Sequence, residues 1–257
     1  MYLVKLGGSV LTDKTRVTTL RPASVQRLAA ELSQSEAEVI LVHGAGSFGH
    51  IKALRHGLEE GYVDDDQLPA VSEVQRDVRA LNLAVVDALR RAGLRPVSLP
   101  PSAIARLEDG VLRTLDVEVF RRYRELGFTP VTFGDVVLDA RRWFGVCSGD
   151  LLMLALAEAF RPVAAIFVAD VDGVYTADPK RGKSAKFLRE IGPESLAAID
   201  TAGVTVDDVT GGLEGKLHRM IAVAKFADRC LLLNGLKKGR LLAALRGQRV
   251  VSTRVTP

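Results

Sequence analysis

The sequence predicts an α/β fold in which helices cover both faces of a mostly parallel central sheet. Short β-branched runs alternate with longer helical patterns along the chain, which is the element order of a parallel sheet. The 257 residues are 47% hydrophobic and 26% charged, so the chain is long and apolar enough to hold a core without metals or disulfides. Because no Pro/Gly/Ser-rich linker interrupts it, two lobes sharing one sheet are favoured over two independent domains.

The first third of the chain is expected to supply two strands and two helices. Residues 2–6 form a strand, and Pro22 begins a helix whose apolar residues lie on one face. A second strand, 39–42, ends in a glycine-rich loop at 43–50. The longest helix is predicted over 69–91, because apolar residues recur there every three or four positions, and Gly93 ends it.

The middle of the chain alternates strands, hairpins and helices. A strand over 96–99 precedes a hairpin turn at Asp109-Gly110. A helix over 117–125 ends at Gly127, and a strand covers 130–133. Residues 136–138 and 143–146 form a second hairpin, after which Ser148 opens a helix that runs to Phe160.

The last third begins with a buried strand over 164–169 and a long polar segment rich in Asp, Gly and Lys. A helix over 213–226, a strand over 230–233, a short helix over 238–245 and a strand over 250–255 follow.

Charge and cysteine content exclude several classes of protein. Lys and Arg exceed Asp and Glu by 35 to 31, and the cations are spread along helices, so no nucleic-acid partner is expected. Cys147 and Cys230 each lie in an apolar stretch, as expected of core residues in a reducing cytosol. The N-terminus has no signal-peptide pattern, and the longest apolar stretch, 151–160, is too short to span a bilayer. A soluble, cytoplasmic protein without a membrane partner is expected.

Two glycine-rich loops follow the first two predicted strands, at the sheet edge where ligands bind. In Lys5-Leu6-Gly7-Gly8-Ser9, the glycines allow backbone amides to approach an anion and the lysine adds a charge, although an ordinary turn is the alternative. The second loop, HGAGSFGH at 43–50, contains G-x-G-x-x-G, but the next strand comes too late for a dinucleotide-binding unit. A compact phosphate held by amides and His50 fits better, whereas His43 could be purely structural.

Two later segments carry charged residues after strands. Ser148 could simply cap a helix, with Asp150 in its first turn, or Asp150 could orient nearby lysines. The Asp-rich segment 170–178 lacks the glutamate of a calcium-binding EF-hand. Gly215-Lys216 is not a P-loop, because Thr210 stands at a required glycine and Leu217 follows the lysine.

Together these segments predict phosphoryl transfer without a P-loop. Lys5, Lys14 and Lys216 lie in glycine-rich contexts with amide-rich turns and a histidine, and no nucleophile is evident. Phosphoryl transfer depends mainly on positioning and charge neutralisation, which such residues supply.

In order, these segments resemble the amino acid kinase superfamily over nearly the whole chain. The resemblance lies in KLGGS at 5–9, TDK at 12–14, FGD at 133–135, SGD at 148–150, TADP at 176–179 and TGG at 210–212 through Lys216. Within the superfamily, HGAGSFGH resembles the isopentenyl phosphate kinases, with fosfomycin kinases as near relatives. The resemblance implies one open αβα sandwich over 1–257, with an acceptor-binding half at about 1–160 and a nucleotide-binding half at about 161–257.

The resemblance also implies roles for individual residues. ATP would be bound by Lys5, Gly7, Gly8, Ser9, Gly46, Asp150, Asp170, Tyr175, Asp178, Gly211, Gly215 and Lys216. The acceptor phosphate would be bound by Ala45, Gly46, Gly49, His50 and Gly134. Catalysis would rest on Lys14, which stabilises the moving phosphoryl group, with Lys5, His50, Asp150 and Lys216. The superfamily uses Mg²⁺ held mainly by the nucleotide, so no protein metal site is expected, and its members are commonly homodimers.

The implied reaction is phosphorylation of isopentenyl phosphate by ATP, a step of isoprenoid biosynthesis in the mevalonate pathway. A phosphate monoester is mostly dianionic at neutral pH and needs no strong general base. Candidate walls for its apolar tail are Val71, Val74, Val78 and Leu81, which could equally be core residues. Fosfomycin or another small phosphate or phosphonate is the alternative acceptor, and a phosphate sensor without turnover is the alternative from another class.

Overall fold

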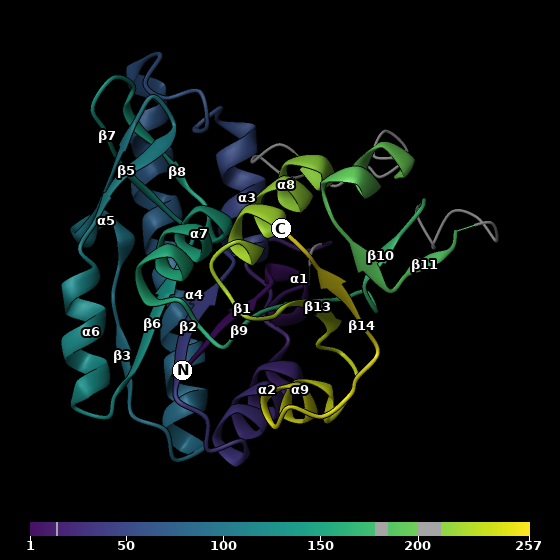
Figure 1. Cartoon of the computed structure of the whole chain (residues 1–257). Coiled ribbons are helices and arrows are strands. Elements are labelled where there is room, and N and C mark those ends of the chain that lie inside the picture. Colours follow the sequence, from purple (N-terminus) through teal and green to yellow (C-terminus); the bar gives the residue numbers. More distant parts are fainter. Residues whose placement is uncertain (14, 178–184, 200–211) are drawn as a thin grey trace.

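The computed structural model describes residues 1–13, 15–177, 185–199 and 212–257. Within them, a central sheet of eight strands has the order β12-β14-β13-β9-β1-β2-β6-β3 (Figure 1). Every neighbouring pair is parallel except β13 and β14, which are antiparallel. The strands are β1 (Tyr2–Leu6), β2 (Val39–His43), β3 (Pro96–Ser98), β6 (Thr129–Phe133), β9 (Ala164–Ala169), β12 (Glu190–Ile191), β13 (Cys230–Asn234) and β14 (Ser252–Val255). The predicted mostly parallel sheet is confirmed.

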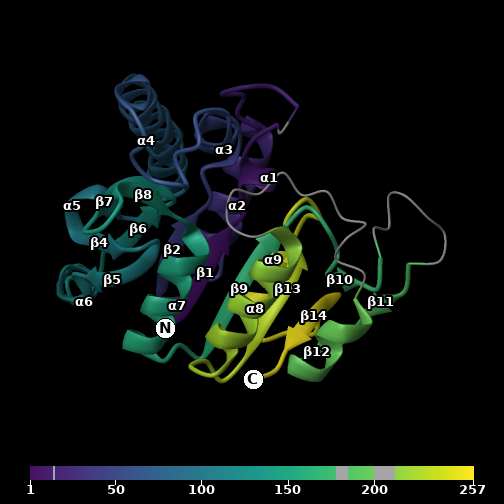
Figure 2. The same ribbon diagram turned by 90° about the horizontal axis from the view of Figure 1, so that it is seen from above.

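Helices cover the two faces of this sheet (Figure 2). Each face has its own apolar core. One core contains side chains of α6 (Val117–Glu125), α7 (Gly149–Phe160) and α8 (Gly212–Ala224). The other contains side chains of α1 (Gly8–Leu11), α2 (Pro22–Gln34), α4 (Leu68–Arg91) and α9 (Arg240–Leu245). Successive side chains of β1 point to opposite faces of the sheet, so that Leu3 belongs to the first core and Val4 to the second.

The two predicted hairpins form a separate four-stranded sheet in the order β5-β4-β7-β8. Its strands are β4 (Ala105–Glu108), β5 (Val111–Leu115), β7 (Asp135–Asp139) and β8 (Trp143–Cys147), and α5 (Pro101–Ile104) precedes them. Asp109 and Gly110 both have positive φ, at 53° and 76°, as a type I′ hairpin turn requires. Both hairpins are therefore confirmed.

The structure differs from the sequence-based expectation in the second glycine-rich segment. Residues 43–50 were expected to form a loop, but α3 (Gly46–Arg55) begins inside it, which places His50 on a helix. Because glycine has a low helix propensity, the sequence of this segment does not indicate that a helix begins there. Short elements of two to six residues are not predicted either, because so few residues carry little periodic signal. They are η1 (Asp65–Gln67), β10 (Val174–Tyr175), β11 (Phe187–Leu188), β12 and η2 (Pro193–Ala198).

The strand order places a topological switch point beside β1. The chain continues from β1 to β2 on one side and later adds β9 on the other. In open α/β sheets, ligands bind at the carboxyl ends of the strands at such a point. A ligand-binding site is therefore expected at the carboxyl end of β1.

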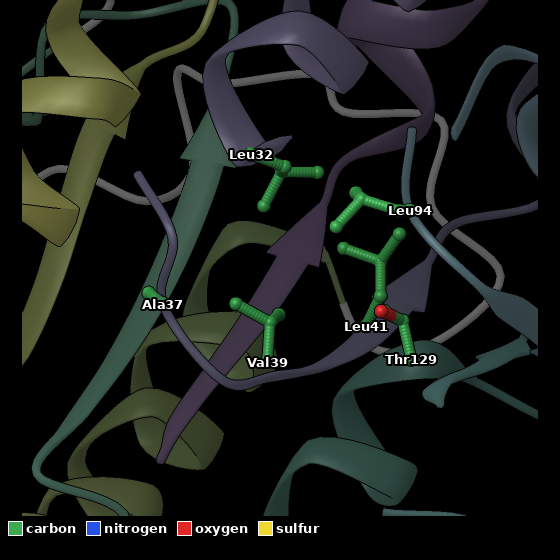
Figure 3. A pocket seen from close by; sticks show the side chains of 6 residues that line it. All are labelled: Leu32, Ala37, Val39, Leu41, Leu94 and Thr129. Carbon is green, nitrogen blue, oxygen red and sulfur yellow. The ribbon is translucent and has the colours of Figure 1, made fainter. Parts of the chain in front are cut away.

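A small apolar recess lies at the opposite end of the strands (Figure 3). Val39 and Thr129, which begin β2 and β6, line it with Leu32, Ala37, Leu41 and Leu94. These residues carry no charge, and we assign no function to the recess. None of the described helices is long and apolar enough to cross a membrane.

Candidate active site

The two glycine-rich segments after β1 and β2 pack against each other at the switch point. A Cβ on Gly8 would lie 2.4 Å from Cα of Gly46, and one on Gly44 would lie 2.8 Å from the Gly8 nitrogen. On the other side of β1, the Gly7 amide donates to the carbonyl of Val168 in β9 at 2.8 Å. Only glycine permits backbones to come this close. The predicted nucleotide loop and acceptor loop are thus in direct contact.

Lys5 and Asp150 form an ion pair beside these loops. The Lys5 Nζ lies 2.6 Å from Oδ1 of Asp150, and the two side chains are 10% and 4% exposed. Asp150 is in the first turn of α7, whose N-cap Ser148 accepts a hydrogen bond from the Leu151 amide. The Ser148 cap is confirmed, and Asp150 meets a lysine as expected. A carboxylate at this distance holds a buried cation in position.

The starts of α3 and α7 converge on Gly134, directly after β6. A Cβ on Gly134 would lie 3.5 Å from the Gly149 nitrogen and 3.7 Å from the Ala45 nitrogen. Helix N-termini favour anions through their amides and dipoles. Residues from three parts of the sequence therefore border one place suited to a phosphate.

His50 lies on α3 one turn after Gly46, so the two share a face of that helix. The neighbouring face packs closely on α4: a Cβ on Gly49 would lie 3.0 Å from Cγ1 of Val78. Lys52 joins the two helices by ion pairs with Glu73 and with Asp77, whose Oδ2 is 2.5 Å from Nζ. Burial opposes the charge of Lys52, but its hydrogen bonds to Asp77 and Glu73 raise its pKa above the usual value. These two ion pairs hold α3, the helix that carries His50, against α4.

Lys14 lies outside the described residues, but the segments on either side of it are attached to α3. The Thr12 hydroxyl donates to the Gly8 carbonyl at 2.8 Å and accepts from the Ser47 amide at 3.0 Å. The Ser47 hydroxyl accepts from the Thr19 amide at 3.2 Å. Thr12 and Ser47 are buried, and they tie both flanks of position 14 to the acceptor loop.

The predicted nucleotide residues of the second half are described in part. Asp170 follows β9, Tyr175 lies in β10 with its ring against Phe187, and Gly215 and Lys216 lie in α8. α8 packs on α7, the helix that carries Asp150. Asp178 and Gly211 lie outside the described residues, as do Asp208 to Thr210.

A polar cluster orders the chain after β9. Oδ1 of Asp172 accepts from the Asn234 side chain at 2.9 Å and from Arg240 at 2.7 Å. These contacts connect the loop after β9 to the end of β13 and the start of α9.

His43 is completely buried and has hydrogen-bond partners at both ring nitrogens. Nδ1 lies 3.1 Å from the Gly44 carbonyl and Nε2 lies 3.1 Å from Nδ2 of Asn82. Burial lowers the pKa of His43 to about 4, so the ring is neutral at physiological pH. Of the two interpretations that the sequence left open for His43, the structural one fits.

Asp135, next to Gly134, is a buried carboxylate that joins α4 to β7. Its Oδ2 lies 3.3 Å from Nη2 of Arg79. Burial raises the pKa of Asp135, and the Arg79 charge opposes that shift only in part. Burial also raises the pKa of the nearby Cys147 thiol to about 12, which makes it inert at neutral pH.

The four candidate tail-pocket residues of α4 fall into two environments. Leu81 belongs to the core shared with α2, which is ordinary packing. Val74 and Val78 belong to a smaller cluster with Phe133, and Val71 and Ala45 pack against it. This smaller cluster lies beside the acceptor loop, so only its members remain candidates for a tail pocket.

No group of three or more His, Cys, Asp or Glu side chains suited to a metal occurs in the described part of the chain.

Sequence reasoning missed the residues that support the loops. Thr12 and Ser47 lie in the TDK and HGAGSFGH motifs, but the hydrogen bond between them joins residues 35 positions apart, and Asn82 bonds to His43 over 39 positions, so no local pattern reveals these supports. The sequence indicates Gly149 only as part of a helix start. In the structure it lies against Lys5, and a Cβ at this position would lie 3.1 Å from Cε of that lysine.

Residues 1–234 match the model of the amino acid kinase family. The chain belongs to the amino acid kinase family. Two relatives in this family are isopentenyl phosphate kinases. The one from Thermoplasma acidophilum is 39% identical over 91% of this chain and 92% of its own, and the one from Methanothermobacter thermautotrophicus is 36% identical over 100% and 99%.

Solved structures of the family agree with this placement. An X-ray structure of isopentenyl phosphate kinase superposes with a TM-score of 0.87 at 33% identity and covers both chains completely. The product complex of the T. acidophilum enzyme gives 0.82 at 34% identity over 99% of each chain. UMP kinase from Ureaplasma parvum, at 16% identity and a TM-score of 0.65, shares the amino acid kinase fold.

Proposed function

We propose that this chain transfers the γ-phosphoryl group of ATP to isopentenyl phosphate and forms isopentenyl diphosphate and ADP. The observation that carries the proposal is the contact between the KLGGS and HGAGSFGH loops, where Gly8 meets Gly46. Such a contact brings a nucleotide phosphate and an acceptor phosphate within reach of one another. Similarity to isopentenyl phosphate kinases over nearly the full length supports the choice of acceptor.

The reaction needs positioning and charge neutralisation more than acid–base chemistry. An oxygen of the acceptor phosphate attacks the γ-phosphorus, and the bond from that phosphorus to the β–γ bridging oxygen breaks, so that ADP leaves. Lys5, fixed by Asp150, and Lys216 would hold the nucleotide phosphates. Lys14 would neutralise the transferring group. Gly7, Gly8 and Ser9 would add backbone amides.

The acceptor phosphate would bind where α3 begins. Ala45, Gly46 and Gly49 form the first turn of this segment, Gly134 faces it, and His50 would donate a hydrogen bond to the phosphate. On the nucleotide side, Asp170, Tyr175 and Gly215 would line ATP, as would Asp178 and Gly211. We extend the assignment to a cytoplasmic homodimer that acts in isoprenoid synthesis through the mevalonate pathway.

The residues fit a magnesium ion that is held by the nucleotide rather than by the protein. Asp150, the carboxylate in the first turn of α7, is engaged by Lys5, and the described residues offer no group of three or more His, Cys, Asp or Glu side chains that could hold a metal. When bound, Mg²⁺ would neutralise phosphate charge between ATP and the acceptor.

An ADP-release assay with ATP and one acceptor at a time tests the proposed function. We expect turnover with isopentenyl phosphate, and none with fosfomycin or without an acceptor. Turnover with fosfomycin alone would contradict the choice of acceptor. Binding of isopentenyl phosphate without turnover would favour a phosphate sensor.

Replacing His50 by Ala tests the division between the two phosphates. We expect kcat with isopentenyl phosphate to fall about a hundredfold, because a hydrogen-bond donor to the reacting group is lost. The Kd of ATP, measured by calorimetry, should stay within about twofold. An equal loss of ATP binding would show that His50 is not on the acceptor side.

A further inference from the structure

A chain of side-chain hydrogen bonds runs from β3 through α4 to the acceptor loop. The Ser98 hydroxyl donates to Oδ1 of Asn82 at 2.5 Å. The Asn82 amide nitrogen lies 3.1 Å from Nε2 of His43, and Nδ1 of His43 lies 3.1 Å from the Gly44 carbonyl oxygen. Asn82 and His43 are 4% and 0% exposed, so water does not compete for the bond between them or for the bond to Gly44, whereas Ser98 is at the exposed end of β3.

The Gly44 carbonyl sets the direction of every bond in this chain. Because a carbonyl oxygen can only accept, Nδ1 of His43 must carry the proton. Nε2 is then an acceptor and takes a hydrogen bond from the Asn82 amide. The Asn82 oxygen is left to accept from Ser98. Reversing the chain would place a bare Nδ1 against the Gly44 oxygen.

Gly44 is the last residue before the proposed acceptor site, and it is held from both sides. Its amide donates to the Leu6 carbonyl of β1 at 2.9 Å, while its carbonyl faces His43. The His43 ring stacks on Phe133, with centroids 5.2 Å apart, and the His43 carbonyl accepts from the Gly134 amide at 3.0 Å. The orientation of the 44–45 peptide therefore depends on the imidazole, because no strand pairing in the described part of the chain fixes that carbonyl.

We propose that His43 and Asn82 are positioning residues, which orient the Gly44 carbonyl and thereby hold the backbone of Ala45 and Gly46 in place for the acceptor phosphate. Ser98 completes the chain by fixing the orientation of the Asn82 amide. This inference rests on the acceptor role proposed above for Ala45 and Gly46.

Three pairs of ionisable groups lie on the surrounding elements. Lys5 of β1 meets Asp150 of α7, Arg79 of α4 meets Asp135 of β7, and Asp77 of α4 meets Lys52 of α3. His50 of α3 and Cys147 of β8 complete the set. Because burial lowers the pKa of His43 to about 4, the ring in the wild-type chain remains neutral, with its proton on Nδ1, at pH values well above 4.

Asn82→Asp tests the proposal, because a carboxylate cannot donate to Nε2. At low pH, one additional proton is shared by His43 and the new carboxylate, and Nδ1 keeps its bond to Gly44. At high pH that proton is lost, the remaining one moves to Nε2 to meet the carboxylate, and the Gly44 bond breaks. We expect the KM of this variant for isopentenyl phosphate, relative to that of wild type, to rise about fivefold to tenfold between pH 6 and pH 8.5. Loss of one hydrogen bond weakens binding by about this factor. Titration of the acceptor cancels in this ratio, and the KM for ATP should not change.

Asn234→Asp is the matched control, because the chain has two asparagines and both are buried. Asn234 donates to Asp172 in the nucleotide half. We expect its replacement to raise the KM for ATP, by carboxylate repulsion, and to leave the relative KM for isopentenyl phosphate independent of pH. A relative acceptor KM for Asn82→Asp that does not change with pH, or an equal rise in both KM values, would overturn the proposal.

Nitrogen NMR of the ¹⁵N-histidine-labelled wild-type chain tests the proposal without an activity assay. The chain has four histidines, and His43→Gln identifies the signal of His43. We expect a neutral ring protonated at Nδ1 from pH 6 to pH 8.5. An Nε2-protonated ring, or titration near pH 6.5, would overturn the proposal even if Asn82→Asp fails to fold. If wild type does not phosphorylate isopentenyl phosphate while this signal is as expected, the proposed function fails but the hydrogen-bond chain stands.

Discussion

Lys5 and Asp150 show how one charged side chain in this site depends on another. The lysine comes from β1 and the aspartate from α7, and both are almost fully buried. Removing a charged group from water is costly unless an opposite charge accompanies it. The position of the Lys5 charge is therefore set by a residue 145 positions later in the sequence.

Replacing Asp150 by Asn should lower kcat about tenfold to a hundredfold, because Lys5 loses the charge that holds it. Steady-state kinetics with saturating ATP and isopentenyl phosphate measure the effect. Ser148→Ala is the control on the same helix start: it should cost about 1 kcal/mol of stability and leave kcat near the wild-type value. Similar kcat values for the two variants would contradict the role given to Asp150.

At the scale of elements, the site depends on how closely α3 approaches α1 and the end of β1. Gly46 has φ of +52°, and a Cβ there would lie 2.3 Å from Oγ1 of Thr12. Gly247 also has a positive φ, +74°, but no atom lies within 4 Å of its Cβ position. The two glycines share a backbone conformation and differ in their surroundings.

Replacing each of these glycines by Ala separates conformation from contact. Gly247→Ala should cost about 1 kcal/mol of stability, the strain of a left-handed alanine, and keep full activity. Gly46→Ala should lose more stability and at least a hundredfold in kcat/KM for isopentenyl phosphate, because Thr12 and α3 must move apart. Urea unfolding and initial rates provide both numbers. Equal effects of the two variants would show that the contact with Thr12 does not matter.

At the scale of the whole molecule, the neutral, buried His43 links stability to pH. Its pKa is about 4 in the folded state, below the ordinary value of 6.5. Below pH 6.5 the unfolded chain therefore binds a proton that the folded chain excludes. The stability that this residue provides is complete above pH 6.5 and is lost as the pH falls toward 4.

Urea unfolding of wild type should show this loss, up to about 3 kcal/mol between pH 6.5 and 4 from His43. His43→Gln should remove that part of the pH dependence, whereas His218→Gln, at an exposed histidine, should keep it. If wild type and His43→Gln lose the same free energy of unfolding over this range, His43 is not the group responsible.

Periodicity in the sequence was enough to predict the long elements and the class of the fold. The α4 helix and the hairpin turn at Asp109-Gly110 were found because amphipathic spacing and turn chemistry are local properties. The glycine-rich segments with Lys5, His50 and Lys216 identified the amino acid kinase family for the same reason, since each motif is a short run of residues.

Only the tertiary structure decided what supports those motifs. The pairing of Lys5 with Asp150 and the hydrogen-bond chain from Ser98 to Gly44 join residues that are far apart in the sequence. The start of α3 inside HGAGSFGH is local, but glycines are poor helix formers and give no helical pattern there. Buried polar groups require partners, but the sequence does not say which strand or helix supplies them. The strand order around β1 makes that choice, because it brings the ends of β1, β2, β6 and β9 to one edge of the sheet.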